Sequence, residues 1–278
     1  MDLRAIRQPA DLKGLKTAQL DALSAQLRER IIDIVSENGG HLASNLGMVE
    51  LTLALHRVFD SPRDKIIFDV GHQCYAHKLL TDRQEGMERL RQYGGASGFP
   101  KLGESEHDAY GTGHASTAIS AALGMARARD LKGGDEHIVA VVGDGAFTGG
   151  LCYEALNNLG HDKTRLIVVL NDNQMSIAPN VGAMSKYLTY MRTSKAWINL
   201  KRRISNFFLK IPLIGKPLFK LSQRTKDSFK NFLIRDRFFS AFGLRYVGPI
   251  DGHQIKSMEK LLQRAKRFDQ PVLVHVMT

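Results

Sequence analysis

Two short polar motifs, each directly after an apolar run, hold the residues of this sequence best suited to chemistry. They are Gly143-Asp144-Gly145-Ala146 and Asn171-Asp172-Asn173. Short runs that are rich in β-branched residues and end at turn residues are typical of strands buried on both faces of a parallel sheet. Because ligands bind beyond the carboxyl ends of such strands, we expect Asp144 and Asn173 to lie side by side.

This pair predicts a magnesium–diphosphate site. The glycines beside Asp144 let the backbone approach a diphosphate, but the carboxylate and the diphosphate repel each other unless a cation lies between them. Mg²⁺ prefers an octahedron of oxygens and is usually held by few protein groups together with substrate phosphates. We expect the Asp144 carboxylate, the Asn173 amide oxygen and a backbone carbonyl near Met175 to be ligands, completed by phosphate and water oxygens.

Two other interpretations of these motifs are open. A dinucleotide-binding loop needs a third glycine at position 148, where this chain has threonine, and its pyrophosphate would meet an acidic side chain without a metal. Asn171-Asp172-Asn173 can also be an ordinary polar turn. The Gly-Asp-Gly motif one βαβ unit upstream favours the metal site over both.

The elements that must position these residues alternate between strands and helices. This order predicts an α/β fold, a doubly wound and mostly parallel sheet with helices on both faces. The expected strands are 65–70, 138–142, 166–170, 242–246 and 271–277. The expected helices are 17–38, 48–59, 115–129, 149–160 and 255–267. Residues 41–47, 87–110 and 248–253 are expected to be loops or turns.

The composition is ordinary for a globular protein, with 278 residues, 43% hydrophobic and 24% charged. No segment approaches the length of a membrane span, and the N-terminus lacks the apolar core of a signal peptide. Cys74 and Cys152 form no disulfide framework and no metal set. We expect a cytoplasmic protein with no stable membrane insertion.

The net charge of +11 comes from one segment. Residues 186–237 hold fourteen Lys and Arg against two Asp, a net charge of +12 that leaves −1 for the rest. We expect 183–240 to be a basic, mobile helical insertion in a single domain spanning 1–278. It can be a cover that attracts phosphorylated substrates, a solvated helical excursion, or a surface for membrane or nucleic acid. The first interpretation is preferred, and no nucleic-acid partner is expected.

The two polar motifs resemble the thiamine-diphosphate motif of the transketolase group. Four further stretches resemble the 1-deoxy-D-xylulose-5-phosphate synthase family and occur in the same order along the chain. They are 40–47 (GHLASNLG), 69–73 (DVGHQ), 113–117 (GHAST) and 248–253 (GPIDGH). The resemblance implies thiamine diphosphate and Mg²⁺ as cofactors.

The resemblance also implies roles for individual residues. His41, His72 and His114 match histidines that handle proton transfers and hydrogen bonds on substrate and cofactor. Ile177 matches an apolar residue beside the thiazolium ring, with ordinary packing as an equal alternative. The family often has serine at Ala115, so only a backbone contact is expected there. The implied cofactor-binding residues are His72, Gly113, His114, Ala115, Gly143, Asp144, Gly145, Ala146, Asn173 and Ile177.

The implied reaction condenses pyruvate with glyceraldehyde 3-phosphate to 1-deoxy-D-xylulose 5-phosphate and CO₂. It needs a glutamate from a pyrimidine-binding domain, which we expect to be absent from this chain, as is a C-terminal domain. A complementary chain or domain is therefore expected, in a homodimer or heterotetramer. Two alternatives are a split transketolase-like subunit and a non-catalytic thiamine-diphosphate-binding module. His77, His253 and His275 are expected to be structural.

Overall fold

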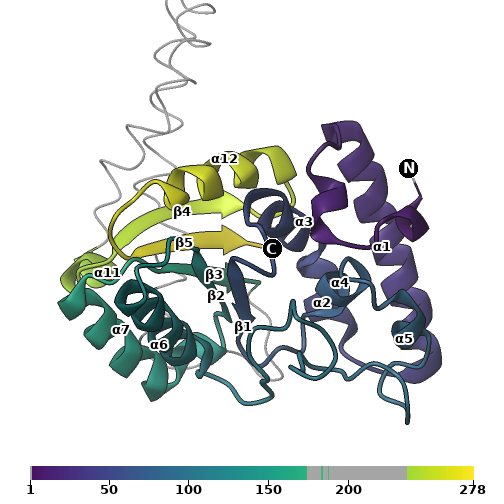
Figure 1. Cartoon of the computed structure of the whole chain (residues 1–278), viewed down its shortest axis with the longest axis horizontal. Helices are drawn as coiled ribbons and strands as arrows, with labels where there is room; N and C mark the ends of the chain where they lie inside the picture. Colours follow the sequence, from purple (N-terminus) through teal and green to yellow (C-terminus); the bar gives the residue numbers. More distant parts are fainter. Residues whose placement is uncertain (1, 174–182, 184–186, 188–236) are drawn as a thin grey trace, which may run out of the picture. The chain divides into compact units, whose positions relative to one another are not determined.

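The computed structural model of the chain describes residues 2–173, 183, 187 and 237–278. Its centre is one sheet of five parallel strands in the order β1-β2-β3-β5-β4 (Figure 1). The strands are β1 (Lys65–Phe68), β2 (Ile138–Gly143), β3 (Ile167–Asp172), β4 (Arg245–Asp251) and β5 (Val272–Met277). The predicted parallel α/β fold is confirmed.

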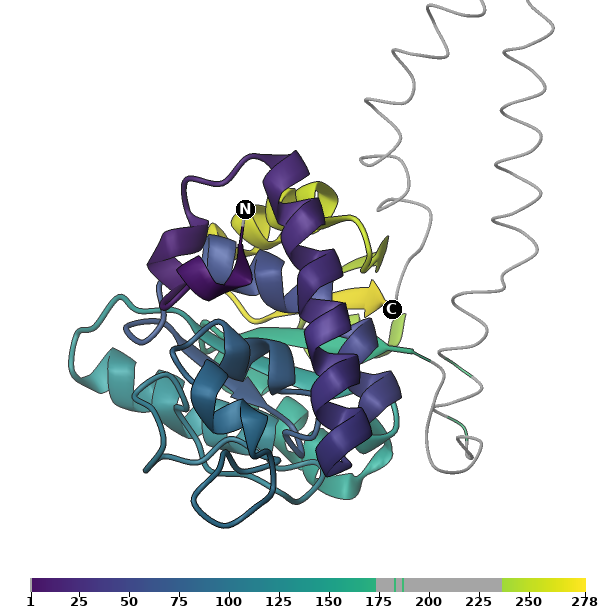
Figure 2. The same cartoon turned by 90° about the vertical axis from the view of Figure 1, so that its right-hand side faces the viewer.

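Helices cover both faces of the sheet (Figures 1 and 2). On one side lie α6 (Ala118–Leu131) and α7 (Gly150–Asp162), and on the other lie α1 (Thr17–Asn38), α3 (Val49–Val58) and α12 (Ile255–Lys266). The shorter helices are α2 (Leu42–Gly47), α4 (Tyr75–Leu79), α5 (Gln84–Glu88) and α11 (Arg237–Ala241). Three 3₁₀ turns span Leu3–Ala5, Pro9–Leu12 and Ala146–Thr148.

The main hydrophobic core lies between the sheet and the α1–α3–α12 side. Val139, Val141 and Val274 of the strands pack there with the buried residues of α1. Because side chains alternate along a strand, Ala140 and Val142 face the α6–α7 side. All of these strand residues are fully buried, as expected for strands that read as continuous apolar runs.

Three details of the sequence prediction are wrong. The apolar spacing within residues 17–38 predicts a core-facing stripe of Leu20, Leu23, Leu27, Ile31, Ile32 and Val35. Ile32 is instead 42% exposed and Ile34 is buried, because the core-facing stripe of α1 continues from Ile31 by three residues. Residues 42–47, expected to be a loop, form α2. Helix α6 begins at Ala118 and not at 115, because Ser116 has a positive φ of 71° that no helix accommodates.

The predicted turn at 248–253 is also wrong in part, because β4 runs through Gly248 and Pro249. β4 is an edge strand, where the missing N–H of proline is tolerated, and its register against β5 shifts between Val247 and Ile250. A side chain at Gly248 would start 2.5 Å from the carbonyl oxygen of His275, so the close approach of the two strands requires glycine.

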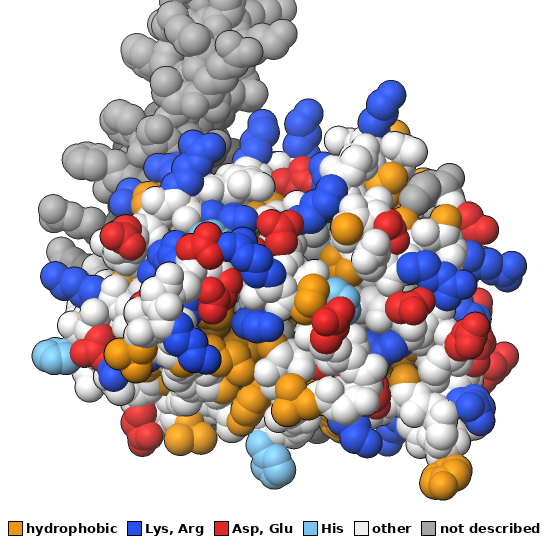
Figure 3. Space-filling model, viewed as in Figure 1, with side chains coloured by type: hydrophobic (Ala, Val, Ile, Leu, Met, Phe, Trp, Pro, Cys, Tyr) orange, Lys and Arg blue, Asp and Glu red, His pale blue; other side chains and the backbone are white. Residues whose placement is uncertain are grey.

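The predicted insertion at 183–240 lies outside the described residues except for positions 183, 187 and 237–240. On the face in Figure 3, basic and acidic side chains are interspersed over the described part of the molecule, in agreement with the near-neutral charge outside 186–237. None of the described helices is long and apolar enough to cross a membrane.

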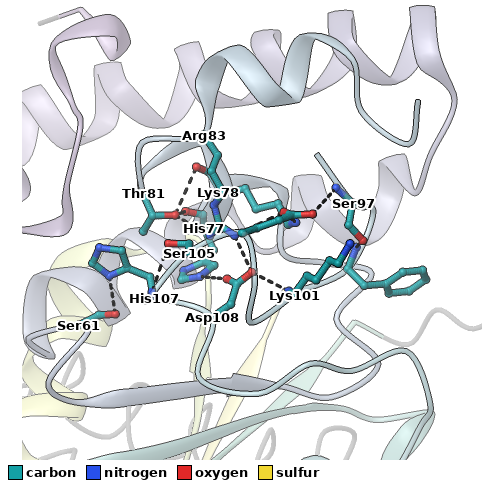
Figure 4. Close-up of polar contacts among 12 residues, drawn as sticks. Ser61, His77, Lys78, Thr81, Arg83, Ser97, Lys101, Ser105, His107 and Asp108 are labelled. Carbon is teal, nitrogen blue, oxygen red and sulfur yellow. Dashed lines mark hydrogen bonds and ion pairs between the residues drawn. The ribbon is translucent and has the colours of Figure 1, made fainter. Parts of the chain in front are cut away.

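A buried polar cluster joins His56 of α3, His77 of α4 and Asp108 of the loop that follows α5; Figure 4 shows its His77 and Asp108 members. The Nε2 atom of His56 lies 2.9 Å from Nδ1 of His77, and Nε2 of His77 lies 3.0 Å from a carboxylate oxygen of Asp108. Complete burial lowers the pKa of His77 to about 4, although Asp108 opposes this shift. His77 is therefore neutral in the folded protein at pH 7.

This burial makes the folded state sensitive to acid. Unfolded His77 regains its ordinary pKa of 6.5, so unfolding takes up a proton between pH 6.5 and about 4. We expect the free energy of unfolding to fall by up to about 3 kcal/mol over this interval as the pH is lowered. Urea titrations at several pH values measure it. The His77→Gln variant should flatten the pH dependence and the surface variant His161→Gln should not; equal slopes would exclude His77 as the cause.

Candidate functional site

The candidate site lies at the carboxyl edge of the sheet, where β1, β2 and β3 end next to one another. Gly143 of β2 pairs with Asn171 of β3, and the backbone N–H of Asp144 donates to the carbonyl of Asn171 over 3.0 Å. Asp144 and Asn173 thus follow adjacent strands at the same edge, as the sequence indicates. Asp144 is buried, and Asn173 is half-buried.

His41 and His72 are brought together at this edge although they are 31 positions apart in the sequence. Their ring centroids lie 5.3 Å apart in an edge-to-face arrangement, and the ring of Phe99 lies 6.1 Å from that of His41. The Nδ1 atom of His72 is buried and has no hydrogen-bond partner among the described residues. A ligand that fills this position can therefore satisfy a polar atom that the described residues leave unpaired.

The environment of the pair keeps both imidazoles neutral at pH 7. Burial, and then the proximity of His41, lower the pKa of His72. Partial burial, and then the Arg91 guanidinium, lower the pKa of His41. A neutral imidazole can accept a proton near neutral pH, return it once protonated, and donate a hydrogen bond through its N–H, which suits acid–base work on a bound substrate. Arg91 was not predicted, because no spacing in the sequence relates it to His41.

Asn45 joins the two histidine segments and was also not assigned a role from the sequence. Its fully buried amide donates to the carbonyl of His41 over 2.6 Å and to that of His72 over 2.7 Å. Its amide oxygen accepts the N–H of Tyr75 over 2.8 Å. One side chain thus fixes the backbone on both sides of the site. The one feature of the sequence that could have indicated a role for Asn45 is its position inside the motif 40–47.

Replacing Asn45 with alanine should destabilise the protein strongly. The change removes three hydrogen bonds, two to the part-buried carbonyls of His41 and His72 and one from the buried N–H of Tyr75, and a buried donor left unpaired costs about 1–3 kcal/mol. We expect the free energy of unfolding to fall by about 3 kcal/mol or more in a urea titration. Asn158→Ala, which removes the exposed hydrogen bond with Arg127, is the matched control and should change it by less than about 0.5 kcal/mol. A small effect for Asn45→Ala would refute the bridging role.

A second group of contacts fixes the loop before α6. Asp69, at the end of β1, accepts the N–H of Ser116 over 2.7 Å and that of Ala118 over 3.0 Å. Burial raises the pKa of Asp69, opposed by these backbone N–H groups. The Ser116 hydroxyl donates to the carbonyl of Ala146 over 2.7 Å. The loop before α6 is therefore tied both to β1 and to the turn after Asp144.

The predicted diphosphate-binding residues of this loop are exposed at its surface. Gly113, His114 and Ala115 precede the buried Ser116. A Cβ atom added at Gly113 or at Gly143 would meet no described atom within 4 Å. Open backbone of this kind beside a helix N-terminus is suited to an anion.

A chain of buried side-chain contacts supports β3, the strand that Asn173 follows. Asp172 accepts from Nε2 of His275 over 3.0 Å, and Nδ1 of His275 lies 2.8 Å from the hydroxyl of Tyr246. His275 is fully buried, and this contact connects β3, β5 and β4 beneath the edge. A structural His275 agrees with the sequence prediction.

Comparison with known proteins identifies the family. Residues 3–278 match the sequence profile described as 1-deoxy-D-xylulose-5-phosphate synthase. The chain belongs to this family. Synthases of that name from Carboxydothermus hydrogenoformans and Symbiobacterium thermophilum are 56% and 52% identical, over 99% and 100% of this chain. The chain covers 44% and 43% of those relatives, and it corresponds to their N-terminal half.

Solved structures confirm the fold of this family member. The transketolase from Campylobacter jejuni matches with a TM-score of 0.64 and 20% identity, over 95% of this chain and 38% of the transketolase. A transketolase mutant from Pichia stipitis matches with a TM-score of 0.65 and 20% identity, over 93% of this chain and 36% of that chain. At this identity the likeness concerns the fold alone.

Two predicted site residues cannot be placed. Met175, the expected backbone ligand, and Ile177, the expected neighbour of the thiazolium ring, lie outside the described residues. The other predicted residues of the site lie at or just after the ends of β1, β2 and β3, or in the segments before α2 and α6. Their roles toward a ligand stay predictions.

Proposed function

We propose that this chain is the diphosphate- and magnesium-binding half of a thiamine-diphosphate-dependent synthase. The reaction is condensation of pyruvate with glyceraldehyde 3-phosphate to 1-deoxy-D-xylulose 5-phosphate and CO₂. A complementary pyrimidine-binding domain or chain supplies the rest of the active site, in a homodimer or heterotetramer. A cytoplasmic location agrees with Cys74 and Cys152, which are free and buried thiols.

The observation that carries the proposal is the convergence of three elements on one edge of a parallel sheet. These are the His41–His72 pair, the exposed loop at Gly113, and Asp144 beside Asn173. A buried carboxylate near open glycine backbone fits a cation bridged to a diphosphate, since Mg²⁺ favours oxygen donors shared between protein and phosphate. The buried, unpaired Nδ1 of His72 fits a polar group of the ligand.

When bound, thiamine diphosphate supplies the chemistry that breaks and forms the carbon–carbon bonds. Asp144 and Asn173 hold Mg²⁺, and the backbone at Gly113, His114 and Ala115 holds the diphosphate. His72 and His41, neutral at pH 7, would donate hydrogen bonds and move protons at the substrate oxygens, and His114 would act from the loop before α6. Residues 186–237 carry a net charge of +12, which would attract phosphorylated substrates.

The donor substrate distinguishes this proposal from a transketolase-like subunit. The protein is purified untagged together with whatever chain accompanies it, and product formation from glyceraldehyde 3-phosphate is followed with pyruvate or with a ketose phosphate as donor. The proposal expects 1-deoxy-D-xylulose 5-phosphate and CO₂ from pyruvate only. Activity with the ketose phosphate alone favours the transketolase-like reading. Cofactor binding with neither activity, and no complementary chain, favours a non-catalytic module.

A further inference from the structure

The loop of residues 97–112, which covers part of the site, is held from beneath by two acidic side chains. Asp108 is fully buried and accepts from Arg83 over 2.6 Å, while Glu104 accepts from the fully buried Lys78 over 2.5 Å (Figure 4). Each carboxylate also accepts a backbone N–H seven residues earlier in the loop. Asp108 binds that of Lys101 over 2.7 Å, and Glu104 binds that of Ser97 over 2.8 Å.

His77, a further partner of Asp108, fixes the positions of the protons in the cluster. Arg83 and His77 hold the pKa of Asp108 well below its usual range, so it is an ionised acceptor. His77 must then donate through Nε2 and accept at Nδ1, where Nε2–H of His56 donates. This arrangement joins the loop to α4 and to α3 with one consistent set of donors.

The 97–112 loop makes three contacts with the segments that hold His41 and His72. The ring of Phe99 lies against His41. Pro100 and Thr112 pack on Gly71, the residue before His72, so closely that a Cβ there would lie 2.3 Å and 2.8 Å from their carbon atoms. Because the loop has no helix or strand of its own between residues 97 and 112, hydrogen bonds to Asp108 and Glu104 define much of its path.

We propose that Asp108, with Glu104 beside it, is a positioning residue that holds the 97–112 loop against His41 and Gly71 and so limits the access of water to the half-buried imidazole of His72. Asp108 touches neither histidine and acts through Phe99, Pro100 and Thr112. A role in catalysis rests on the proposed function, but the placement of the loop does not. The alternative is that Asp108 serves only to stabilise the fold. This explanation is weaker, because the cost of desolvating Asp108 and Arg83 offsets most of the attraction within their buried ion pair.

The test measures the pKa of His72 and His41 by NMR of the purified chain carrying ¹³C-labelled histidine. Signals are assigned with His72→Gln and His41→Gln. In Asp108→Asn the loop loosens, water reaches His72, and the pKa of His72 should rise by about half a pH unit or more toward its ordinary value. Glu104→Gln, which leaves the Asp108–Arg83 pair intact, should give a smaller rise and covers the case in which Asp108→Asn does not fold.

The matched control is Asp135→Asn, which removes the exposed ion pair with Arg63 and should leave both pKa values unchanged. Unchanged pKa values in folded Asp108→Asn and Glu104→Gln, even with a lower melting temperature, would overturn the proposal. So would an equal shift in the control. The experiment measures pKa values and not turnover. An error in the proposed reaction therefore cannot cause unchanged pKa values in the variants or a shift in the control.

Discussion

The Asp144→Ala variant is expected to lose Mg²⁺-dependent binding of thiamine diphosphate. Asp144 is a buried carboxylate at the carboxyl end of β2, next to β3, and in the proposed site its charge would offset that of Mg²⁺. Removing an outer-shell partner of a metal site already costs about 10- to 100-fold in affinity, so loss of a ligand should cost about 100-fold or more. Isothermal titration of the cofactor at fixed Mg²⁺ measures this loss.

Two variants make the Asp144 result specific. Asp144→Asn keeps an oxygen ligand but removes the charge, so its affinity should lie between those of the wild type and Asp144→Ala. Asp135→Ala removes an exposed carboxylate far from the edge and should bind normally. Retention of wild-type, Mg²⁺-dependent affinity in Asp144→Ala would remove this residue from the metal site.

The Asp69→Asn variant should weaken both the fold and the cofactor site. The asparagine side chain keeps one acceptor oxygen, which can still bind one of the two backbone N–H groups of Ser116 and Ala118. Its NH₂ group then faces the other N–H, and two donors cannot pair. A buried donor left unpaired in this way costs about 1–3 kcal/mol. The loop that presents Gly113 then loses its fixed position. A binding cost of about 1.4 kcal/mol from this loosening would reduce cofactor affinity about tenfold.

Asp64→Asn offers a matched control for Asp69→Asn. Asp64 is equally buried at the opposite end of β1 and accepts the N–H of Asp60 over 2.9 Å and that of His137 over 2.8 Å. Urea titration should show similar destabilisation of the two variants, whereas only Asp69→Asn should lose cofactor affinity. If both variants lose affinity equally, the effect is general destabilisation and the specific role of Asp69 is wrong.

The sheet and the edge that carries Asp144 were predictable because their signals are local. An apolar run that ends at glycine, aspartate or asparagine shows both a buried parallel strand and its ligand-facing end. Asn45, Asp69 and Ser116 could not be assigned roles in this way, since each acts on backbone groups that other segments bring to it. Such partners exist only once the loops have been placed.

The errors in the helices have the same origin. α2 has only six residues and includes serine, asparagine and glycine, so its intrinsic helix propensity is low. Tertiary contacts, such as those of Asn45 with His72 and Tyr75, determine its conformation. Helix α6 starts late because Asp69 binds the N–H groups of Ser116 and Ala118. In both places a contact from a distant segment overrides the local preference.

Calorimetric titration of the purified protein with thiamine diphosphate, with thiamine, and with thiamine diphosphate plus a metal chelator tests the central claim most directly. If this chain is the diphosphate- and magnesium-binding half of the site, thiamine diphosphate binds saturably when Mg²⁺ is present. Thiamine, which lacks the diphosphate, and the chelated sample should then show little binding. Equal affinity for thiamine and thiamine diphosphate, or binding that is indifferent to the chelator, would contradict the account.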